Sequence, residues 1–436
     1  MLPALRILDS VRRFRGEVSF KVSFAVRIWK CKWRYAMQLR RLLRKPAHEK
    51  IIVLFIVSDI AKWKEQKLYE AMDVSGIFEP IVGLSAWNSQ NEISCSNDRL
   101  LEIHNEAEVF FARLGDRTVR TVEIINGERR ISDLSEFHPD IVFYTEPWAP
   151  CGQQDAESVS RFALTCYLPY YVPAWGNIER NCRLPLHFFL YRFFVLNSDW
   201  GHYYRKYCKR LSYVPEFIPA GHPALDYFTI DGNISSGKGH VIYAPHYSIY
   251  HSEAQGLPQY LSTFDTTGMA MLRYAQRHRE FKWVFKPHPL LKTRIKKIGL
   301  MDQEEIRAYW DEWGRIGVVC EDGDYQELFN DSIAMVTDSG SFLMEYGATG
   351  KPLIRLLNPK AEPFHRHTAI DICNSYYNVA EVGELEQVLQ MVLERREDPK
   401  RQQRLEALRR AKLFGTNASM NIVSYLAKLL KRQWEA

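Results

Sequence analysis

The chain has 436 residues, of which 46% are hydrophobic and 25% charged, with 58 Lys and Arg against 52 Asp and Glu. This is the composition of a globular protein too long for one ordinary core, so we expect two domains. Its apolar runs fall short of the roughly 20 residues that a membrane-spanning helix needs, which predicts that the chain does not cross a membrane. The eight cysteines show neither C-x-x-C nor zinc spacing, which indicates buried thiols in a reducing cytoplasm.

Positive charge is concentrated at the N-terminus. Residues 1–50 contain 14 Lys and Arg against three acidic residues, which leaves 44 basic and 49 acidic residues in the rest of the chain. Apolar and aromatic residues such as Trp29 and Trp33 are interspersed with these cations. Such a segment can bury apolar side chains at a lipid interface while Lys and Arg meet anionic headgroups. We therefore predict that residues 1–45 associate with an anionic membrane surface; an amphipathic helix packed on the body is the alternative. Nucleic acid is not expected as a partner, because no recognition fold accompanies the charge.

The first domain begins directly after this basic segment. Residues 51–57 form an uninterrupted apolar, β-branched run, typical of a strand buried on both faces of a parallel sheet. Ser58 or Asp59 can then cap a helix that runs through Met72 and leads to a strand at 78–84. Three further strands are predicted at the end of this domain, over 138–144, 162–167 and 193–197.

The second domain repeats this alternation. Residues 229–239 are rich in Gly and Ser and have the composition of a linker. Short apolar runs separated by helical patterns follow it and predict strands over 240–244, 281–285, 317–320, 333–337 and 352–356.

The pattern predicts an α/β protein of GT-B type, with two doubly wound Rossmann-like domains facing a cleft and a basic amphipathic N-terminal segment. The predicted parts are the membrane-surface segment 1–49, the acceptor domain 50–228, the linker 229–239, the nucleotide-donor domain 240–380 and the C-terminal helices 381–436.

Polar residues follow three of the predicted strands of the second domain, in Tyr243-Ala-Pro-His246, Lys286-Pro-His-Pro289 and Thr337-Asp-Ser-Gly-Ser341. Ligands of open α/β sheets bind beyond the carboxyl ends of the strands, so we expect these groups to share a site. Imidazole, ammonium and hydroxyl groups together predict an anion site for a phosphorylated ligand. Each histidine taken alone is more typical of a structural hydrogen bond than of catalysis.

The Asp338 turn is expected to open a helix. Gly340 lets backbone approach an anion closely, and Ser339 and Ser341 can donate hydrogen bonds to phosphate oxygens or simply cap the helix. Glu345 lies one turn further on, where a carboxylate can accept hydrogen bonds from ribose hydroxyls; a solvated helix charge is the alternative.

Lys286 and His288 can neutralise a diphosphate. No Asp-x-Asp pair presents itself as a divalent-metal site, so we expect transfer without a metal, with charge on the leaving group met by cations and helix dipoles. His246 is the candidate general base and His251 a second choice, because a neutral imidazole suits proton abstraction from an alcohol.

These three motifs resemble those of the CDP-glycerol glycerophosphotransferase family, the TagF-like teichoic acid and capsule polymerases of bacteria. The resemblance covers about residues 50–430 and is most specific over 240–352. Two places differ: family sequences commonly have Asp-Tyr-Ser-Ser where this chain has Asp338-Ser-Gly-Ser341, and an Arg- or Asp-rich loop where Tyr247–His251 stands.

The resemblance implies transfer of a polyol phosphate from a CDP-linked donor to a hydroxyl of a lipid-linked surface-polysaccharide or teichoic-acid-like acceptor, at the inner face of the plasma membrane. It implies His246 and His288 in catalysis, and Ser339, Ser341 and Glu345 on the nucleotide side, with no cofactor besides the donor substrate. Two alternatives stay open: a GT-B glycosyltransferase that uses a nucleotide sugar, and a non-catalytic glycan-binding or scaffold protein.

Overall fold

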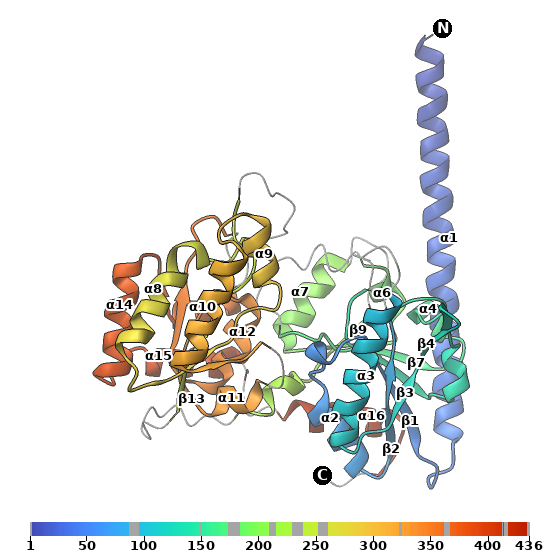
Figure 1. The fold of residues 1–436 in the computed structure, drawn as a ribbon. Helices are drawn as coiled ribbons and strands as arrows, with labels where there is room; N and C mark the ends of the chain where they lie inside the picture. The colour runs from blue at the N-terminus through green and yellow to red at the C-terminus, as the bar shows by residue number, and fades with distance from the viewer. Residues whose placement is uncertain are drawn as a thin grey trace. The chain divides into compact units, whose positions relative to one another are not determined.

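The structure is a computed structural model. It describes residues 2–86, 96–148, 150–172, 184–208, 215–228, 239–251, 260–321, 325–361, 367–411, 413 and 417–433, without the side chains of 2–21, 61, 185, 207, 208 and 367–369. The chain forms two compact units (Figure 1). Unit 1 comprises Met1–Tyr170, Ile178–His222 and Ala418–Ala436, and unit 2 comprises Tyr171–Asn177 and Pro223–Asn417.

Unit 1 is built on a seven-stranded sheet in which all neighbouring strands are parallel, in the order β3-β2-β1-β6-β7-β8-β9. Its strands are β1 Ile51–Val57, β2 Phe78–Leu84, β3 Thr118–Arg120, β6 Ile141–Tyr144, β7 Leu164–Tyr167, β8 Arg192–Val195 and β9 Glu216–Pro219, with a separate hairpin of β4 Val122–Ile125 and β5 Glu128–Ile131. The α-helices are α1 Leu2–Arg44, α2 Gln66–Val74, α3 Asn97–Arg113, α4 Ala156–Val159, α6 Pro185–Phe188, α7 Ser198–Cys208 and α16 Ala418–Leu429.

Unit 2 is built on a six-stranded parallel sheet in the order β12-β11-β10-β13-β14-β15. Its strands are β10 His240–Ala244, β11 Lys282–Phe285, β12 Val318–Val319, β13 Ser332–Thr337, β14 Leu353–Leu356 and β15 Tyr377–Val379. The α-helices are α8 Phe264–Arg277, α9 Leu291–Lys297, α10 Gln303–Ile316, α11 Gln326–Asn330, α12 Gly340–Glu345, α13 His367–Asn374, α14 Val382–Leu389 and α15 Arg401–Ala411.

The two doubly wound sheets predicted from the sequence are confirmed. Strands β1, β2 and β10 begin and end at the predicted residues. β1 and β13 are buried almost throughout, as helices covering both faces of a parallel sheet require. The short strands β3, β9 and β15 were not predicted, because runs of three or four residues at or near a sheet edge carry little apolar pattern.

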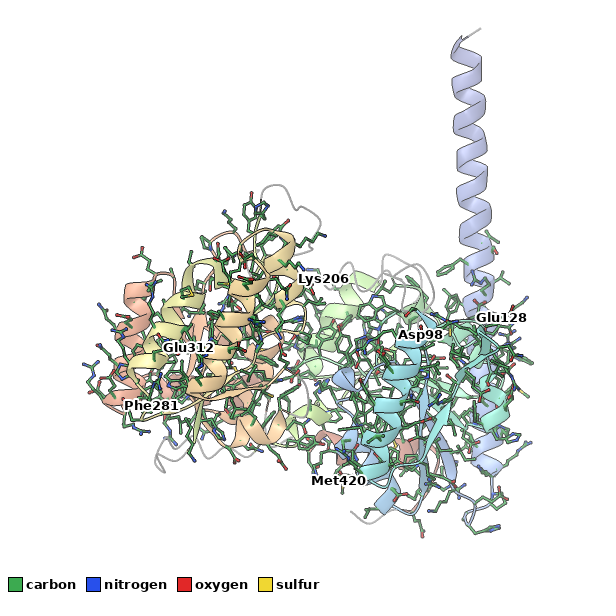
Figure 2. The ribbon with its side chains drawn as sticks, viewed as in Figure 1. Asp98, Glu128, Lys206, Phe281, Glu312 and Met420 are labelled. Carbon is green, nitrogen blue, oxygen red and sulfur yellow. The ribbon has the colours of Figure 1, made fainter. Side chains whose placement is uncertain are left out.

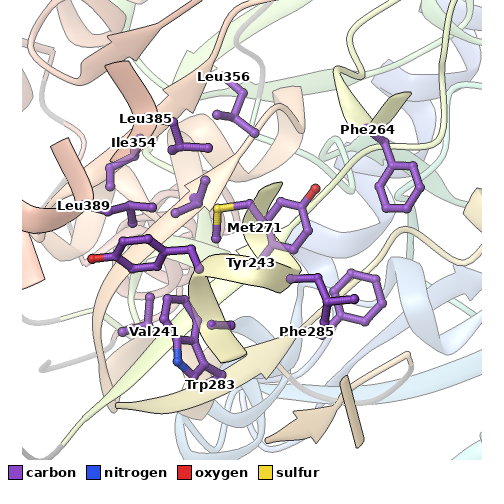
Figure 3. Close-up of a cluster of buried hydrophobic side chains, with 14 of the residues drawn as sticks. Val241, Tyr243, Phe264, Met271, Trp283, Phe285, Ile354, Leu356, Leu385 and Leu389 are labelled. Carbon is purple, nitrogen blue, oxygen red and sulfur yellow. The ribbon is translucent and has the colours of Figure 1, made fainter. Parts of the chain in front are cut away.

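The largest aromatic side chains of unit 2 lie in one core cluster between β10, β11 and the helices beside them (Figure 3). Phe285 stacks on Trp313, with ring centroids 4.9 Å apart, and Tyr243 packs beside both rings. Asp98 and Glu128 of unit 1, which Figure 2 labels, are exposed. A buried aromatic layer therefore holds the strands whose carboxyl ends carry the predicted site.

Helix α1 is anchored to the rest of unit 1 by its C-terminal half. Ile28, Cys31, Tyr35 and Leu42 are buried, and the Tyr35 hydroxyl lies 2.5 Å from that of Thr165. The end of the helix is held by the buried carboxylate of Asp140, which pairs with Arg41 and Lys45. Within the described residues, no helix has both the length and the apolar character needed to cross a membrane.

Three parts of the chain differ from the predicted arrangement. The helix expected from Ser58 or Asp59 begins only at Gln66, because the Ser58 hydroxyl donates to Glu146 instead of capping a helix. The predicted C-terminal segment 381–436 is divided, since α14 and α15 belong to unit 2 whereas α16 packs against α2 in unit 1. Of the predicted linker, residues 229–238 lie outside the described residues.

A buried ion pair fixes α15 on unit 2. Arg404 is fully buried and donates to Asp398 and, over 2.9 Å, to the carbonyl oxygen of Gly350. Asp398 also accepts a hydrogen bond from Tyr377 at 2.7 Å.

We predict that Asp398→Ala lowers the free energy of unfolding by about 3 kcal/mol or more, because it leaves a buried guanidinium without its counter-ion. Urea titration followed by circular dichroism measures the change. Glu397→Ala is the matched control: this neighbouring carboxylate is largely exposed and should change stability by less than about 0.5 kcal/mol. Equal effects of the two substitutions would contradict the prediction.

Candidate active site at the switch point of unit 2

The connections of the unit 2 sheet run in opposite directions from β10 and β13. The chain passes from β10 to β11 and β12 on one side, and from β13 to β14 and β15 on the other. Ala244 and Thr337, the last residues of these two neighbouring strands, are paired in register. Ligands of open α/β sheets bind beyond the carboxyl ends of the strands at such a point. His246 and Asp338 follow these two strand ends.

Asp338 holds the segment after β10 in place. One of its carboxylate oxygens accepts a hydrogen bond from the backbone N–H of His246 at 2.5 Å, and the other accepts from the N–H and hydroxyl of Thr263 at 2.8 and 3.2 Å. Burial raises the pKa of Asp338 to about 6 although these donors oppose the shift. The sequence predicts a phosphate site that includes Asp338 and the turn after it, and the structure gives the Asp338 carboxylate protein partners on both oxygens.

The structure brings the two predicted histidines together. The ring centroids of His246 and His288 are 5.0 Å apart, and the Tyr247 ring lies 4.6 Å from the first and 4.4 Å from the second. Burial, together with the neighbouring His288, lowers the pKa of His246 to about 3. Burial likewise lowers the pKa of His288 to about 4. Both imidazoles are therefore neutral near pH 7.

Hydrogen bonds to the rings identify which nitrogen carries the proton. The backbone N–H of Ser248 donates to Nδ1 of His246 at 3.2 Å, and the backbone N–H of Leu290 donates to Nδ1 of His288 at 3.1 Å. A neutral imidazole whose Nδ1 accepts has its proton on Nε2. Among the described residues neither Nε2 has a hydrogen-bond partner. Each ring therefore keeps one N–H donor for a ligand.

Lys286 directly follows β11, two residues before His288, and is 7% exposed. Its ammonium lies 3.7 Å from the sulfur of Cys320 and 5.7 Å from the centre of the Tyr325 ring. Within the part of the chain that is described, no carboxylate lies at ion-pair distance from it. A nearly buried cation without a protein counter-ion favours a bound anion, because an unpaired buried charge is costly.

The remaining predicted residues lie in the turn and helix after β13. Ser339 is buried at the N-cap of α12 without a side-chain capping bond, and its N–H donates to Thr337 at 2.9 Å. Gly340 is buried and Ser341 is exposed. Glu345 is buried at the end of α12, where its carboxylate accepts a hydrogen bond from Tyr325.

Sequence reasoning missed the residues that orient this site. Thr263 binds Asp338, Ser248 sets the His246 tautomer, and Tyr325 lies between Lys286 and Glu345. Thr263 and Tyr325 are distant in sequence from the groups they contact, and no motif marks them. Ser248 stands two residues after His246. A hydroxyl side chain so close in sequence to an imidazole could have indicated a hydrogen bond between them.

No protein-family model and no curated protein sequence matches the chain. Several solved structures match it over most of its length, and three of them are as follows. The wall teichoic acid polymerase TagF soaked with CDPG gives a TM-score of 0.51 at 11% identity, over 93% of this chain and 98% of that chain. A UDP-GlcNAc 2-epimerase from Neisseria meningitidis bound to UDP-GlcNAc gives 0.50 at 14% identity, over 87% and 100%. A putative UDP-N-acetylglucosamine 2-epimerase from Listeria monocytogenes gives 0.51 at 13% identity, over 88% and 98%.

At these identities the likeness shows the fold alone. The chain has the α/β fold of GT-B type, with two Rossmann-like domains, that its sequence predicts.

The low pKa values of the two imidazoles predict how acid affects stability. Between the folded-state pKa values near 3 to 4 and the unfolded value near 6.5, the unfolded chain binds more protons than the folded chain. The free energy of unfolding should therefore fall from pH 6.5 to pH 4, by at most about 1.4 kcal/mol per pH unit for each imidazole. The raised pKa of Asp338 acts in the opposite sense below pH 6.

Urea titrations of the wild type and of His246→Gln/His288→Gln between pH 7 and pH 4 test this. The double variant should lose less stability on acidification than the wild type, while the exposed His202→Gln should follow the wild type. Parallel curves for the wild type and the double variant would contradict the assignment.

Proposed function

We propose that the protein is a transferase that moves a polyol phosphate, of the glycerol phosphate type, from a CDP-linked donor to a hydroxyl of a surface-polysaccharide or teichoic-acid-like acceptor. The observation that carries this proposal is the anion-binding character of the switch point in unit 2. The nearly buried ammonium of Lys286 lacks a protein counter-ion among the described residues. The neutral imidazoles of His246 and His288, which follow the neighbouring strands β10 and β11, each keep an Nε2–H donor. A diphosphate meets both requirements.

The proposed step breaks one phosphorus–oxygen bond and forms another. The acceptor hydroxyl oxygen attacks the phosphorus that carries the polyol, and the bond from that phosphorus to the bridging oxygen breaks, so that CMP leaves. The hydroxyl proton passes to His246 where that residue acts as general base, and otherwise to solvent. Lys286 and His288 stabilise the negative charge on the departing phosphate, with Ser339 beside the β13 end. Positioning and electrostatic stabilisation supply catalysis in such transfers. We propose that no divalent metal takes part.

His246 has two possible roles in this step. In the tautomer set by Ser248 N–H it donates from Nε2 to a phosphate oxygen. To act as general base at Nε2, His246 must be in the tautomer that carries its proton on Nδ1. In that tautomer Nδ1–H donates a hydrogen bond to the Ser248 hydroxyl oxygen, 2.7 Å away. A bound diphosphate makes protonation of the ring easier, because negative charge nearby raises the pKa of a histidine.

The fold supports a nucleotide-linked substrate. Among the similar solved structures, TagF was soaked with CDPG and an epimerase holds UDP-GlcNAc. The second of these favours the alternative of a glycosyltransferase that uses a nucleotide sugar, in which the same groups would hold the diphosphate while the acceptor attacks an anomeric carbon.

Product analysis separates the two reactions, because the bond broken differs. Purified protein is incubated with CDP-glycerol, CDP-ribitol and UDP-GlcNAc together with a membrane fraction as acceptor. Release of CMP supports the polyol phosphate transferase, and release of a nucleoside diphosphate supports the glycosyltransferase. If neither CMP nor a nucleoside diphosphate is released, and no nucleotide raises the melting temperature, the result supports a non-catalytic glycan-binding or scaffold protein.

We predict that Lys286→Met and His246→Ala each lower kcat/KM for nucleotide release by about 100-fold or more, since each removes a group that meets developing charge. His246→Gln keeps an amide donor near the place of Nε2 but cannot accept a proton. Substantial activity of His246→Gln indicates a donor role, and loss equal to that of His246→Ala indicates a base. His202→Ala is the control, because this histidine lies outside the site. Full activity of both Lys286→Met and His246→Ala would contradict the proposal.

We further propose that the protein is peripherally bound to the inner, cytoplasmic face of the plasma membrane through α1. The face of α1 opposite its anchored side presents an apolar stripe at spacings of three and four residues. Its members are exposed: Val22, Val26, Trp29, Trp33 and Met37. The side chains of Trp29 and Trp33 are 65% and 58% exposed.

Cations border this stripe. On a helix of about 3.6 residues per turn, Lys30 and Lys32 fall on its two opposite edges, and both are exposed. Tryptophans that project from a helix between lysines fit the boundary between acyl chains and anionic headgroups.

We predict that Trp29→Ala/Trp33→Ala lowers the fraction of full-length protein that sediments with phosphatidylglycerol vesicles several-fold, because the apolar contact is lost. Lys30→Glu/Lys32→Glu should weaken binding most at low salt, where screening is least. The control is Val74→Ala/Val109→Ala, which changes exposed apolar residues elsewhere in unit 1. Unchanged sedimentation of both α1 variants would refute this role of the helix.

A further inference from the structure

Tyr247 is the third ring of the cluster that contains the two histidines of unit 2. Its ring centroid lies 4.6 Å from that of His246 and 4.4 Å from that of His288, and each pair of rings is tilted by 41°. The N–H of His288 donates to the carbonyl oxygen of Pro245 at 3.0 Å, which joins the segments after β10 and β11 beside this cluster. The phenol therefore lies at the same edge of the sheet as both imidazoles, where open α/β sheets bind ligands.

The position of Tyr247 is fixed by its surroundings. Its side chain is partly buried and packs against the hydrophobic core of unit 2. Its carbonyl oxygen accepts a hydrogen bond from the N–H of the fully buried Ile249 at 2.8 Å. On either side of it in the chain, the N–H of Ser248 donates to Nδ1 of His246. The ring is thus held before a ligand arrives, which lowers the entropy cost of any contact that it makes.

The hydroxyl of Tyr247 is available to a ligand. Within the described residues it makes no hydrogen bond, and it is not closed off from solvent. The Nε2 atoms of His246 and His288 likewise have no partner there. A phenol O–H donates one hydrogen bond and its oxygen can accept others. Three hydrogen-bonding groups of one ring cluster are therefore open to the same ligand.

The groups around this hydroxyl indicate the class of ligand. His246 and His288 offer N–H donors, and the nearly buried Lys286 supplies a positive charge after β11. The carboxylate of Asp338, which binds this segment, already accepts hydrogen bonds on both oxygens. A set made of donors and a cation favours a negatively charged ligand rich in acceptor oxygens, as a diphosphate is.

We propose that Tyr247 is a phosphate-binding residue of the unit 2 site, whose hydroxyl donates a hydrogen bond to an oxygen of the diphosphate that Lys286 and the two imidazoles hold. The inference rests on the anion site of the function proposed above. It does not depend on the reaction that follows binding.

Isothermal titration calorimetry of the full-length protein with inorganic pyrophosphate tests this contact. Tyr247→Phe keeps the ring and removes only the hydroxyl. It should weaken binding about tenfold, the effect of losing one hydrogen bond to a charged group. Tyr247→Leu also removes the ring contacts with the imidazoles and should weaken binding further.

Tyr250→Phe is the matched control. This tyrosine belongs to the same segment, is 39% exposed, and has its ring against Tyr260 and the ammonium of Lys360. Removal of its hydroxyl should leave the pyrophosphate affinity within about twofold of the wild type, as is usual for a surface substitution.

Two further measurements separate a hydrogen bond to the ligand from a structural role. A bond from an uncharged donor is screened much less than a charge, so Tyr247→Phe should weaken binding by a similar factor at low and high salt, whereas the loss in Lys286→Met should be greatest at low salt. Nitrogen-15 NMR of the unliganded Tyr247→Phe protein should show both imidazoles with the proton on Nε2, as in the wild type. A changed tautomer would mean that Tyr247 acts through the histidines, which overturns a direct contact.

Failure of this inference is distinguishable from failure of the proposed function. If Tyr247→Phe binds pyrophosphate as well as the wild type does, or if Tyr250→Phe loses as much affinity, the inference is overturned while the anion site stands. If the wild type does not bind pyrophosphate at millimolar concentration, the anion site is wrong and the inference falls with it. If binding follows the expected pattern but no CDP-linked donor releases CMP, the inference holds and the proposed reaction does not.

Discussion

The carboxylate of Asp338 is the contact on which the candidate site of unit 2 depends. It stands at the carboxyl end of β13 and accepts hydrogen bonds from the backbone of His246 after β10 and from Thr263 before α8. Two strand ends and a helix start are thereby fixed by one buried group. The neighbouring Ser248 and Leu290 then orient the two imidazoles through their Nδ1 atoms. The result is a set of N–H donors and one ammonium whose positions are decided before any ligand arrives, which is what electrostatic stabilisation requires.

The same topology occurs in both units with different chemistry. In unit 2 the groups at the strand ends are imidazoles and an ammonium with no carboxylate partner among the described residues, a combination that favours anions. In unit 1 the connections diverge between β1 and β6, and Glu146, which follows β6, is paired with Lys62, whose ammonium also lies 5.6 Å from the centre of the Trp148 ring. The groups that favour an anion therefore lie at the strand ends of unit 2.

Helix α1 shows how far a composition argument reaches. The excess of cations and aromatic residues in the first 50 residues predicts an amphipathic segment, with membrane contact and packing on the body as alternatives. In the structure its C-terminal half has both kinds of surface: Ile28, Cys31 and Tyr35 are buried on one side, and Trp29 and Trp33 are exposed on the other. Packing on unit 1 is therefore an observation, and membrane contact by the exposed stripe stays a proposal.

The sequence by itself determined the longer strands, their parallel arrangement and the two-domain fold, because buried apolar runs such as 51–57 and 240–244 have a length and composition that few other structures satisfy. It also placed His246, His288 and Lys286 at strand ends. It did not predict the short strands β3, β9 and β15. Only the tertiary structure decided which nitrogen of each imidazole carries the proton. It also decided that the Asp338 carboxylate accepts a hydrogen bond from the backbone N–H of His246, and that Glu146 pairs with Lys62, which contacts Trp148. These depend on contacts between residues far apart in the chain, such as Asp338 with Thr263, and no local pattern records them.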